Sequence, residues 1–220
     1  MTKLLNDEVI DQVKEAFQGL QKEVQVLFFD GEDCQYCDDT RNLIQELAAL
    51  NHKINLDIYH LDQDQKVAQQ YNVDKAPGLV IASKNGADPV DHGIRYAGIP
   101  AGHEFSSLIQ DLLMVSSGEA QLSQPTLDFL EELDEPLHLQ VFVTTSCPHC
   151  PRAVFLAHRL AFASDKIQAE MVESSEFMEL AQQYNVSGVP DTSINHGQGR
   201  VVGAVPEDHM VEEIRQTLSA

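Results

Sequence analysis

Apolar and polar positions follow two periodicities along the chain, and the same order of elements occurs twice. The predominantly apolar segments 24–29 and 137–143 are typical of buried strands, whereas the spacing of Leu43, Leu47 and Leu50 is helical. In each half, helices alternate with strands and a pair of strands precedes the last helix, which predicts a mixed sheet with helices on both faces. The predicted helices are 6–19, 34–50, 63–71, 102–116, 124–133, 147–163, 176–184 and 207–219. The predicted strands are 24–29, 54–60, 79–83, 93–96, 137–143, 167–172, 192–195 and 200–203.

An internal repeat relates the two halves at an offset of 113 residues. The six-residue string at 68–73 recurs unchanged at 181–186, and Pro77 falls on Pro190 at the same offset. Because such a set of matches at one offset does not arise by chance, we infer two copies of one folding unit. The predicted units are 1–118 and 119–220. Each is expected to be an α/β domain with a mixed central sheet flanked by helices.

The 220-residue chain has a formal net charge of −21, spread almost evenly over its two halves. Such a charge disfavours nucleic acid and anionic membranes as partners, and we interpret it as a solvated acidic surface. Adaptation to a saline cytoplasm is the alternative. No apolar run reaches about 18 residues, so no membrane span is predicted. The N-terminus lacks the apolar core of a signal peptide, so we expect a cytoplasmic protein.

All four cysteines lie in two Cys-x-x-Cys pairs, Cys34 with Cys37 and Cys147 with Cys150, which the repeat places at equivalent positions. Each pair follows an apolar strand, and we expect the helix after it to begin at the first cysteine. Two such thiols can close a disulfide or share a metal, and in an intracellular chain this favours catalysis or metal binding. A helix N-terminus stabilises a thiolate. We therefore expect the first cysteine of each pair to attack and the second to resolve.

The residues between the cysteines differ in the two pairs. His149, when protonated, stabilises a thiolate at Cys147, and Pro148 suits the first position of a helix. The N-terminal pair encloses Tyr36 instead and has several acids around it, which oppose thiolate formation. We therefore predict that Cys147 is the more acidic and reactive thiol. The acids around the N-terminal pair are Asp30, Glu32, Asp33, Asp38 and Asp39.

Each first cysteine precedes a loop proline by 43 residues, Pro77 in the first unit and Pro190 in the second. A proline at a fixed distance from a reactive site in both units predicts a cis peptide bond, with an ordinary trans turn proline as the alternative. In the cis form the backbone of Ala76 or Val189 is expected to pair with an extended substrate.

Two acids in the strands before those loops, Glu173 and Asp57, are interpreted as occupying matching strand regions. Each is a candidate to relay a proton to a resolving thiol. The alternative is a solvated acid at a strand end.

Nearly the whole chain resembles the protein disulfide oxidoreductases, or glutaredoxin-like proteins, which consist of two fused thioredoxin folds. The resemblance implies dithiol–disulfide exchange on protein thiols and disulfides in the cytoplasm, cis bonds at Pro77 and Pro190, and reduction by a thioredoxin-reductase-like flavoenzyme. We expect no bound cofactor. The segments that carry the resemblance are 34–37, 93–105, 141–151 and 171–173.

The chain departs from this family at two positions of the second site. The family usually has Cys-Pro-Tyr-Cys there, whereas His149 matches the Cys-Pro-His-Cys of periplasmic disulfide oxidases and implies a shift toward oxidation. Asp191 follows the proline where a neutral or basic residue is more usual, and its charge is expected to oppose the effect of His149.

Three other functions compete with disulfide exchange. Two Cys-x-x-Cys pairs are also the pattern of a zinc site, although each pair has its own strand and helix. A peptide-binding or chaperone module is a second alternative. An electron relay to a peroxidase is a third, because tandem domains of this kind begin the peroxiredoxin reductases. One domain there normally lacks its cysteine pair, which disfavours this alternative. We predict a protein-disulfide oxidoreductase or isomerase with no metal, whose C-terminal pair is primary.

Overall fold

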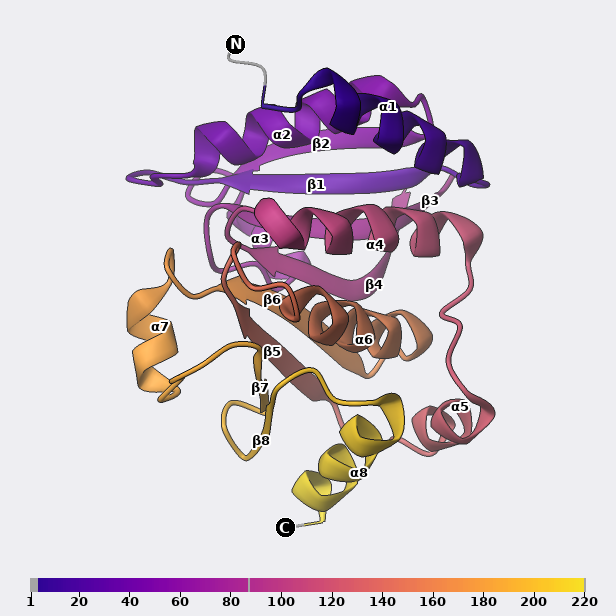
Figure 1. Cartoon of the computed structure of the whole chain (residues 1–220), viewed down its shortest axis with the longest axis vertical. Coiled ribbons are helices and arrows are strands. Elements are labelled where there is room, and N and C mark those ends of the chain that lie inside the picture. Colours follow the sequence, from indigo (N-terminus) through magenta and orange to yellow (C-terminus); the bar gives the residue numbers. More distant parts are fainter. Residues whose placement is uncertain (1–3, 87, 220) are drawn as a thin grey trace. The chain divides into compact units, whose positions relative to one another are not determined.

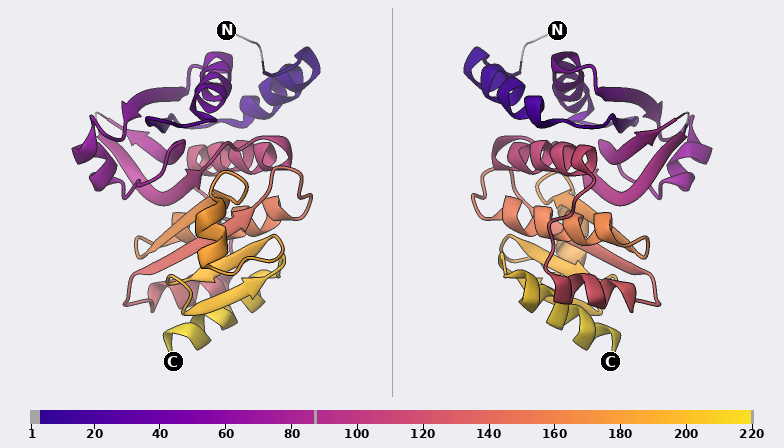
Figure 2. Two further views of the ribbon diagram at one scale, coloured as in Figure 1. Left: turned by 90° about the vertical axis from the view of Figure 1, so that its left-hand side faces the viewer. Right: turned by 90° about the vertical axis from the view of Figure 1, so that its right-hand side faces the viewer.

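A computed structural model describes residues 4–86 and 88–219, and the chain divides into two compact units. The N-terminal unit comprises the chain up to Asp91, together with Arg95–Ile99 and Leu108–Glu119. The C-terminal unit comprises His92–Ile94, Pro100–Ser107 and the chain from Ala120 onward. The boundary after residue 118 stays a prediction. Figure 1 shows the elements in chain order, and Figure 2 shows two further views of them.

The sheet of the N-terminal unit has the strand order β2-β1-β3-β4. Strand β1 pairs parallel with β2 and antiparallel with β3. The strands of this sheet are β1 (Val24–Asp30), β2 (Ile54–His60), β3 (Gly78–Asn85) and β4 (Asp88–Ala97). The helical elements are α1 (Asp7–Ala16), a 3₁₀ turn (Phe17–Gly19), α2 (Cys37–Leu50), α3 (Gln65–Gln70) and most of α4 (Phe105–Ser117). The 3₁₀ turn before α4 (Gly102–Glu104) belongs to the C-terminal unit.

The C-terminal unit repeats this arrangement with the strand order β6-β5-β7-β8, in which β5 is parallel to β6 and antiparallel to β7. Helix α7 lies on one face of its sheet, and α6 and α8 lie on the other (Figures 1 and 2). The strands are β5 (Leu137–Val143), β6 (Ile167–Glu173), β7 (Asp191–Ile194) and β8 (Gly199–Val202). The helices are α5 (Gln124–Glu131), α6 (Cys150–Ala163), α7 (Met178–Gln183) and α8 (Glu207–Leu218).

The central strands form because their apolar runs are buried on both faces. The side chains of β1 from Val24 to Phe29 are buried, and β5 is buried along nearly its whole length. The start of helix α1 is set by local sequence. The Asn6 side chain caps the helix by accepting a hydrogen bond from the backbone N–H of Val9, and acids occupy the first turn, where the helix dipole favours them. Among the described residues, no helix is long and apolar enough to cross a membrane.

The repeat does not extend to the packing of the α3 and α7 faces. In the N-terminal unit that face holds an apolar cluster of Leu27, Phe29, Ala68, Tyr71, Val80 and Ala82. At the offset of 113 residues, Leu27 corresponds to Gln140 and Val80 to Ser193, and both polar residues are buried. Gln140 donates a hydrogen bond of 2.9 Å to Glu170. The C-terminal unit therefore has a more polar interior on this face.

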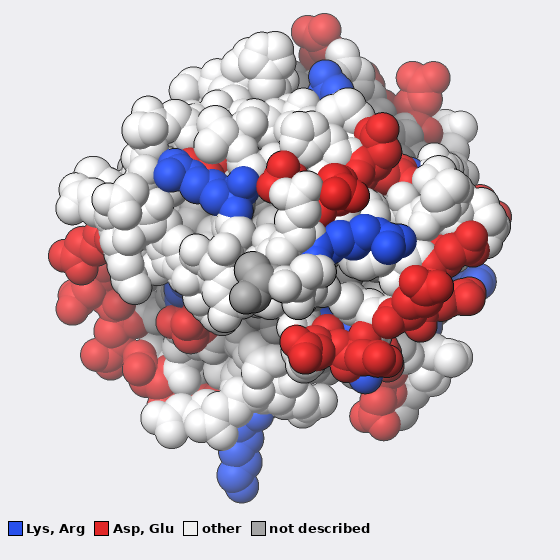
Figure 3. Space-filling model, turned by 90° about the horizontal axis from the view of Figure 1, so that it is seen from below, with Lys and Arg blue, Asp and Glu red and all other residues white. Residues whose placement is uncertain are grey.

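The surface carries the negative charge expected from the sequence. Figure 3 shows one face, on which carboxylates gather in several clusters and a few Lys and Arg side chains lie among uncharged ones.

Glu207, at the start of α8, joins that helix to α5. One of its carboxylate oxygens accepts hydrogen bonds from the N–H of Ser123 at 2.8 Å and from its hydroxyl at 2.7 Å. The Arg159 guanidinium lies 3.5 Å from the other oxygen. Burial alone raises the pKa of Glu207, but hydrogen bonds from Thr126 and Ser123, together with Arg159, outweigh it and hold the pKa below its ordinary value.

We therefore expect Glu207 to stabilise the C-terminal unit in a pH-dependent way. A carboxyl whose pKa is lowered by folding stabilises the folded state above its unfolded pKa, and this contribution is lost as the pH falls through the folded pKa. Between about pH 7 and about pH 3, Glu207→Gln is expected to lose less stability than the unaltered chain. Urea unfolding at several pH values measures this. Glu212→Gln, an exposed change on the same helix, is the control, and parallel pH profiles for all three proteins would contradict the assignment.

Candidate active sites

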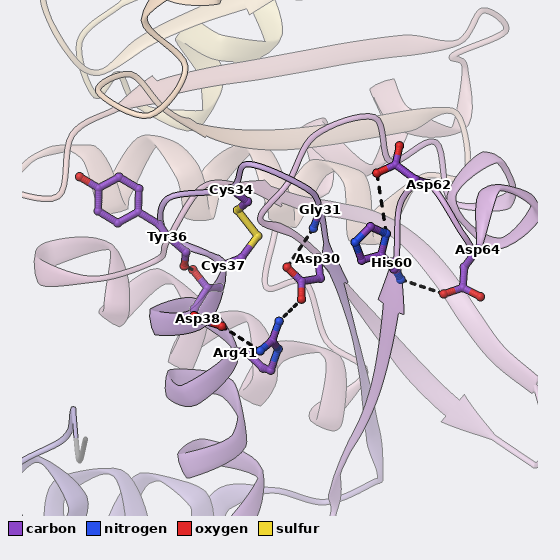
Figure 4. Close-up of polar contacts among 11 residues, drawn as sticks. Asp30, Gly31, Cys34, Tyr36, Cys37, Asp38, Arg41, His60, Asp62 and Asp64 are labelled. Atoms are coloured by element: carbon purple, nitrogen blue, oxygen red, sulfur yellow. Dashed lines mark hydrogen bonds and ion pairs between the residues drawn. A yellow bond between two sulfur atoms is a disulfide. The ribbon is translucent and has the colours of Figure 1, made fainter. Parts of the chain in front are cut away.

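The N-terminal site is a disulfide between Cys34 and Cys37, placed directly after β1 (Figure 4). Cys37 is buried with 3% of its surface exposed, whereas Cys34 is half-buried. The carbonyl of Tyr36 accepts hydrogen bonds from the N–H of Thr40 at 2.9 Å and from its hydroxyl at 2.8 Å, so Tyr36 caps α2.

The expected start of both cysteine helices is wrong by three residues. Helices α2 and α6 begin at the second cysteine, Cys37 and Cys150, because the three residues before each form a turn that the helix follows. Pro148 lies in that turn and is not the first helical residue. Pro151 instead occupies the first turn of α6, where a missing N–H costs nothing.

A charged pair lies beside the N-terminal disulfide. Figure 4 shows the Asp30 side chain between the Cys34–Cys37 disulfide and the guanidinium of Arg41. Arg41 binds Asp30 through one nitrogen and Asp38 at 2.9 Å through another. Asp30 also accepts the N–H of Gly31 at 2.9 Å. The side chain of Asp30 is 17% exposed and that of Arg41 is 30% exposed, so this ion pair is partly buried.

The sequence interpretation missed this pair. It treated Asp30 and Asp38 as acids without a nearby cation, although Arg41 lies three residues beyond Asp38 on the same helix. At the offset of 113 residues, Asp30 corresponds to Val143 and Arg41 to Val154, and both valines are fully buried. The two sites therefore differ beside the disulfide as well as between the cysteines.

The C-terminal site is a disulfide between Cys147 and Cys150 at the start of α6. Cys150 is fully buried, and Cys147 is 8% exposed. The backbone N–H of Cys150 points at the Cys147 sulfur from 3.1 Å. This N–H belongs to the free end of the helix, so it can stabilise negative charge on that sulfur once the disulfide is reduced. Pro148 and His149 are exposed on the solvent side of the pair.

Both loop prolines follow cis peptide bonds, Ala76–Pro77 and Val189–Pro190. The Val189 carbonyl oxygen lies 3.8 Å from the Cys147 sulfur, which places the loop directly at the C-terminal pair. In the N-terminal unit a Cβ on Gly31 would lie 2.8 Å from the Cβ of Ala76. Gly31 directly follows β1 and precedes Cys34 by three residues. The cis-proline loop at Ala76 therefore also borders the cysteine pair of its unit.

Glu173 and Asp57 do not occupy equivalent places, contrary to expectation. Glu173 pairs with Val143 at the end of β6, and its counterpart in the N-terminal unit is His60, which pairs with Asp30. Glu173 is buried, and one of its oxygens accepts the N–H groups of Ser175 and Glu176, each at 2.7 Å. Asp57 is exposed in the middle of β2, opposite Leu27, three residues before the strand end that faces the cysteines.

Asp191, the acid after the second cis proline, is paired. Its carboxylate is almost fully buried and accepts hydrogen bonds from Arg200 Nε at 2.9 and 3.0 Å, as well as from a terminal nitrogen of the same guanidinium. The hydrogen bonds and the charge of Asp191 raise the pKa of Arg200. Asp191 therefore does not act as an isolated charge. Among residues 4–86 and 88–219, no group of three or more His, Cys, Asp or Glu is arranged to hold a metal ion.

Comparisons with known proteins define the class to which this geometry belongs. Residues 22–110 and 137–216 match the family model for the thioredoxin domain, so the chain belongs to that family and contains its domain twice. The expected fold class, two tandem thioredoxin-like folds, is thereby confirmed. With a Cys-x-x-Cys disulfide in each half, the chain is a tandem thioredoxin-fold oxidoreductase.

Two solved structures show the same tandem arrangement over 96% of this chain. A protein disulfide oxidoreductase from Aeropyrum pernix K1 is 26% identical with a TM-score of 0.86, and the match covers 92% of that chain. This confirms the resemblance on which the sequence interpretation relied. The NTD_N/C domain of the alkylhydroperoxide reductase AhpF from Enterococcus faecalis is 26% identical with a TM-score of 0.87, and the match covers 99% of it.

Curated relatives are longer proteins. An alkyl hydroperoxide reductase protein from Staphylococcus epidermidis is 25% identical over 201 residues, which is 90% of this chain and 36% of that protein. A protein from Bacillus subtilis named NADH dehydrogenase is 23% identical over 201 residues, which again is 90% of this chain and 36% of that protein. The chain thus spans little more than a third of the relatives that it matches.

Proposed function

We propose that the chain exchanges thiols and disulfides with protein substrates through both cysteine pairs, with the C-terminal pair as the primary site. The contact that carries this proposal is at Cys147, whose sulfur lies 3.1 Å from a helix N–H and 3.8 Å from the carbonyl before cis-Pro190. A reactive sulfur at the start of a helix thus lies beside a backbone segment that is free to pair with an extended chain. His149 on the solvent side adds a positive charge when protonated.

The geometry supports a two-step exchange that balances in electrons. The Cys147 thiolate attacks one sulfur of a substrate disulfide, so that a mixed disulfide forms and the other substrate sulfur leaves as a thiolate, which takes up a proton. The Cys150 thiol loses its proton and attacks the Cys147 sulfur. This step closes the Cys147–Cys150 disulfide and releases the second substrate thiolate. Two electrons pass to the substrate, and the reverse sequence oxidises a substrate dithiol.

Burial separates the roles of the two cysteines. Cys150 is fully buried, so its sulfur reaches Cys147 but not a bulky substrate. The same order holds at the N-terminal site, where Cys34 is more exposed than Cys37. We assign attack to Cys34 and Cys147, and resolution to Cys37 and Cys150. Tyr36 and His149, which precede the two helices, are the residues that tune the pairs, and Ala76 and Val189 offer the substrate-binding backbone.

An electron relay is the second candidate, and the alkyl hydroperoxide reductase relatives support it. In that role a thioredoxin-reductase-like flavoenzyme reduces one pair, and the electrons continue to the disulfide of a peroxidase. Both units of this chain carry a cysteine pair, so either pair is able to take part. We propose the flavoenzyme as the source of electrons in both candidate functions and the cytoplasm as the place of action.

An insulin-reduction assay tests the proposed function. The unaltered chain is expected to accelerate the precipitation of insulin by dithiothreitol, and a variant with all four cysteines replaced by serine is expected to leave the uncatalysed rate unchanged. If both proteins merely kept insulin in solution, the chain would be a binding module and the proposal would fail. Supplying the oxidised form of a two-cysteine peroxidase as the substrate separates the two candidates, because a relay reduces it much faster than insulin.

A further inference from the structure

In each unit, an arginine on the last strand, β4 or β8, donates a hydrogen bond to the loop before the cis proline. In the N-terminal unit, Arg95 Nε donates to the carbonyl of Tyr71 at 2.7 Å. In the C-terminal unit, a terminal nitrogen of Arg200 donates to the carbonyl of Asn185 at 3.1 Å. Both acceptors lie where the chain leaves the preceding helix and enters the loop. The arginines therefore hold the near end of each loop.

A glycine three residues after each arginine holds the far end. The N–H of Gly98 donates to the carbonyl of Pro77 at 2.9 Å, and the N–H of Gly203 donates to that of Pro190 at 2.8 Å. Gly98 and Gly203 have φ angles of +99° and +91°, a conformation that side chains rarely allow. The spacing Arg-x-x-Gly thus clamps both ends of a cis-proline loop in each unit.

The acid that fixes the arginine differs between the units. Arg95 pairs with Asp91, four residues earlier, at 2.5 Å and 2.8 Å, and is 2% exposed. Arg200 is 41% exposed and pairs with Asp191, which directly follows Pro190. Residue Gly78 stands at the place of Asp191 in the N-terminal unit, and a Cβ there would lie 2.6 Å from the Lys75 carbonyl oxygen. Only the C-terminal unit can tie its arginine to the residue after the cis proline.

The C-terminal loop also borders a cavity. This cavity, of about 380 Å³, lies beside the Arg200–Asp191 ion pair. It is lined by Asp191, Arg200, Asn185, Tyr184 and Ser193, among others. The hydroxyl of Ser193 is buried with no hydrogen-bond partner among the described residues. In the N-terminal unit the counterpart of Ser193 is Val80, which belongs to the apolar cluster there. Because the loop lacks that apolar contact, it depends more on the ion pair and on the hydrogen bonds at its two ends.

We propose that Arg200 and Asp191 are positioning residues for disulfide exchange at Cys147. Through Asn185 and through the link from Asp191 to Pro190, they keep the carbonyl of Val189 at the Cys147 sulfur, where an extended substrate pairs with the loop. This role rests on the proposed function. It predicts a loss of protein-substrate binding and no loss of sulfur reactivity, because neither residue contacts the reacting atoms.

The test uses the full chain with Cys34 and Cys37 changed to serine, so that only the C-terminal pair reacts. In this background, Arg200→Met and Asp191→Asn are each expected to raise the KM for insulin about tenfold, which corresponds to about 1.4 kcal/mol, with little change in kcat. The rate with a small aromatic disulfide is expected to stay as in the background protein. The pKa of the Cys147 thiol is expected to stay the same in Asp191→Asn, which leaves no unpaired buried carboxylate behind. Arg200→Lys keeps the charge but not the forked contact, so it is expected to restore only part of the affinity.

Arg215→Met is the matched control, because Arg215 is an exposed arginine of α8 that stacks on Phe129. The positioning role is overturned if the KM for insulin is unchanged, or if the small-disulfide rate falls as much as the insulin rate. A shift in the thiol pKa of the Asp191→Asn variant would overturn it too. A background protein that is itself inactive on insulin would instead refute the proposed function. Asp191→Asn preserves the shape of the Asp191 side chain. If Arg200→Met does not fold, the KM of Asp191→Asn for insulin therefore decides whether the positioning role holds.

Discussion

Cys147→Ser is expected to lower the initial rate of insulin reduction by at least about a hundredfold at the C-terminal site. The serine oxygen neither forms a mixed disulfide nor accepts electrons, so no other group replaces the lost sulfur. Because the sulfur lies beside the Val189 carbonyl and a helix N–H, its removal takes away the nucleophile and leaves the substrate loop intact. Turbidity assays with dithiothreitol, corrected for the uncatalysed rate, measure the effect.

The matched variant is Cys34→Ser, which removes the corresponding sulfur of the other unit. It is expected to cost less than half of the total rate, because the C-terminal pair remains. Cys150→Ser is expected to accumulate a mixed disulfide with the substrate, which non-reducing gels detect. A larger loss in Cys34→Ser than in Cys147→Ser would reverse the assignment of the primary site. Such a reversal has a physical basis, since Cys34 is the more exposed of the two attacking cysteines.

Arg41→Met is expected to destabilise the N-terminal unit by about 2 kcal/mol. The change leaves the Asp30 carboxylate, 17% exposed, beside the disulfide without its guanidinium. A partly buried charge that loses its partner keeps its desolvation cost and loses the attraction that offset it. The unpaired carboxylate is also expected to raise the pKa of the nearby thiols in the reduced protein. Urea unfolding and thiolate absorbance titration measure the two effects.

The C-terminal unit supplies the matched control for this experiment. Replacing both partners, Asp30→Val with Arg41→Val, reproduces the pair Val143 and Val154 that stands at the equivalent place. The double variant is expected to unfold within about 1 kcal/mol of the unaltered chain, because two apolar side chains leave no buried charge behind. If the double variant were less stable than Arg41→Met, the guanidinium would be stabilising the unit by contacts other than its ion pairs.

The elements of this fold follow closely from the apolar pattern and the repeat. Strands 54–60 and 137–143 were predicted at their observed bounds, and the cysteine helices end at Leu50 and Ala163 as expected. This succeeded because buried strands and helices are set by local periodicity, and because each half served as a check on the other. The start of the cysteine helices was wrong, since the disulfide turn before them has no periodicity to read.

The contacts around the cysteines were less predictable, because they depend on how side chains from different elements meet. The pairing of Asp30 with Arg41 arises only when α2 packs against the end of β1. The sequence interpretation counted charges near Cys34 along the chain, and it therefore treated a neutralised acid as a repulsive one. The matching of Asp57 with Glu173 failed similarly, because register rather than general proximity decides which strand residues are equivalent.

Gly78 has a consequence for the history of the two halves. The place that holds Asp191 in one unit admits no side chain in the other, because the Lys75 carbonyl and a methyl group of Val73 occupy the space. Exchanging one residue between the copies therefore cannot convert one loop into the other, since the backbone would have to move first. Since their duplication, the two halves have therefore diverged in the backbone beside the cis proline as well as in their side chains.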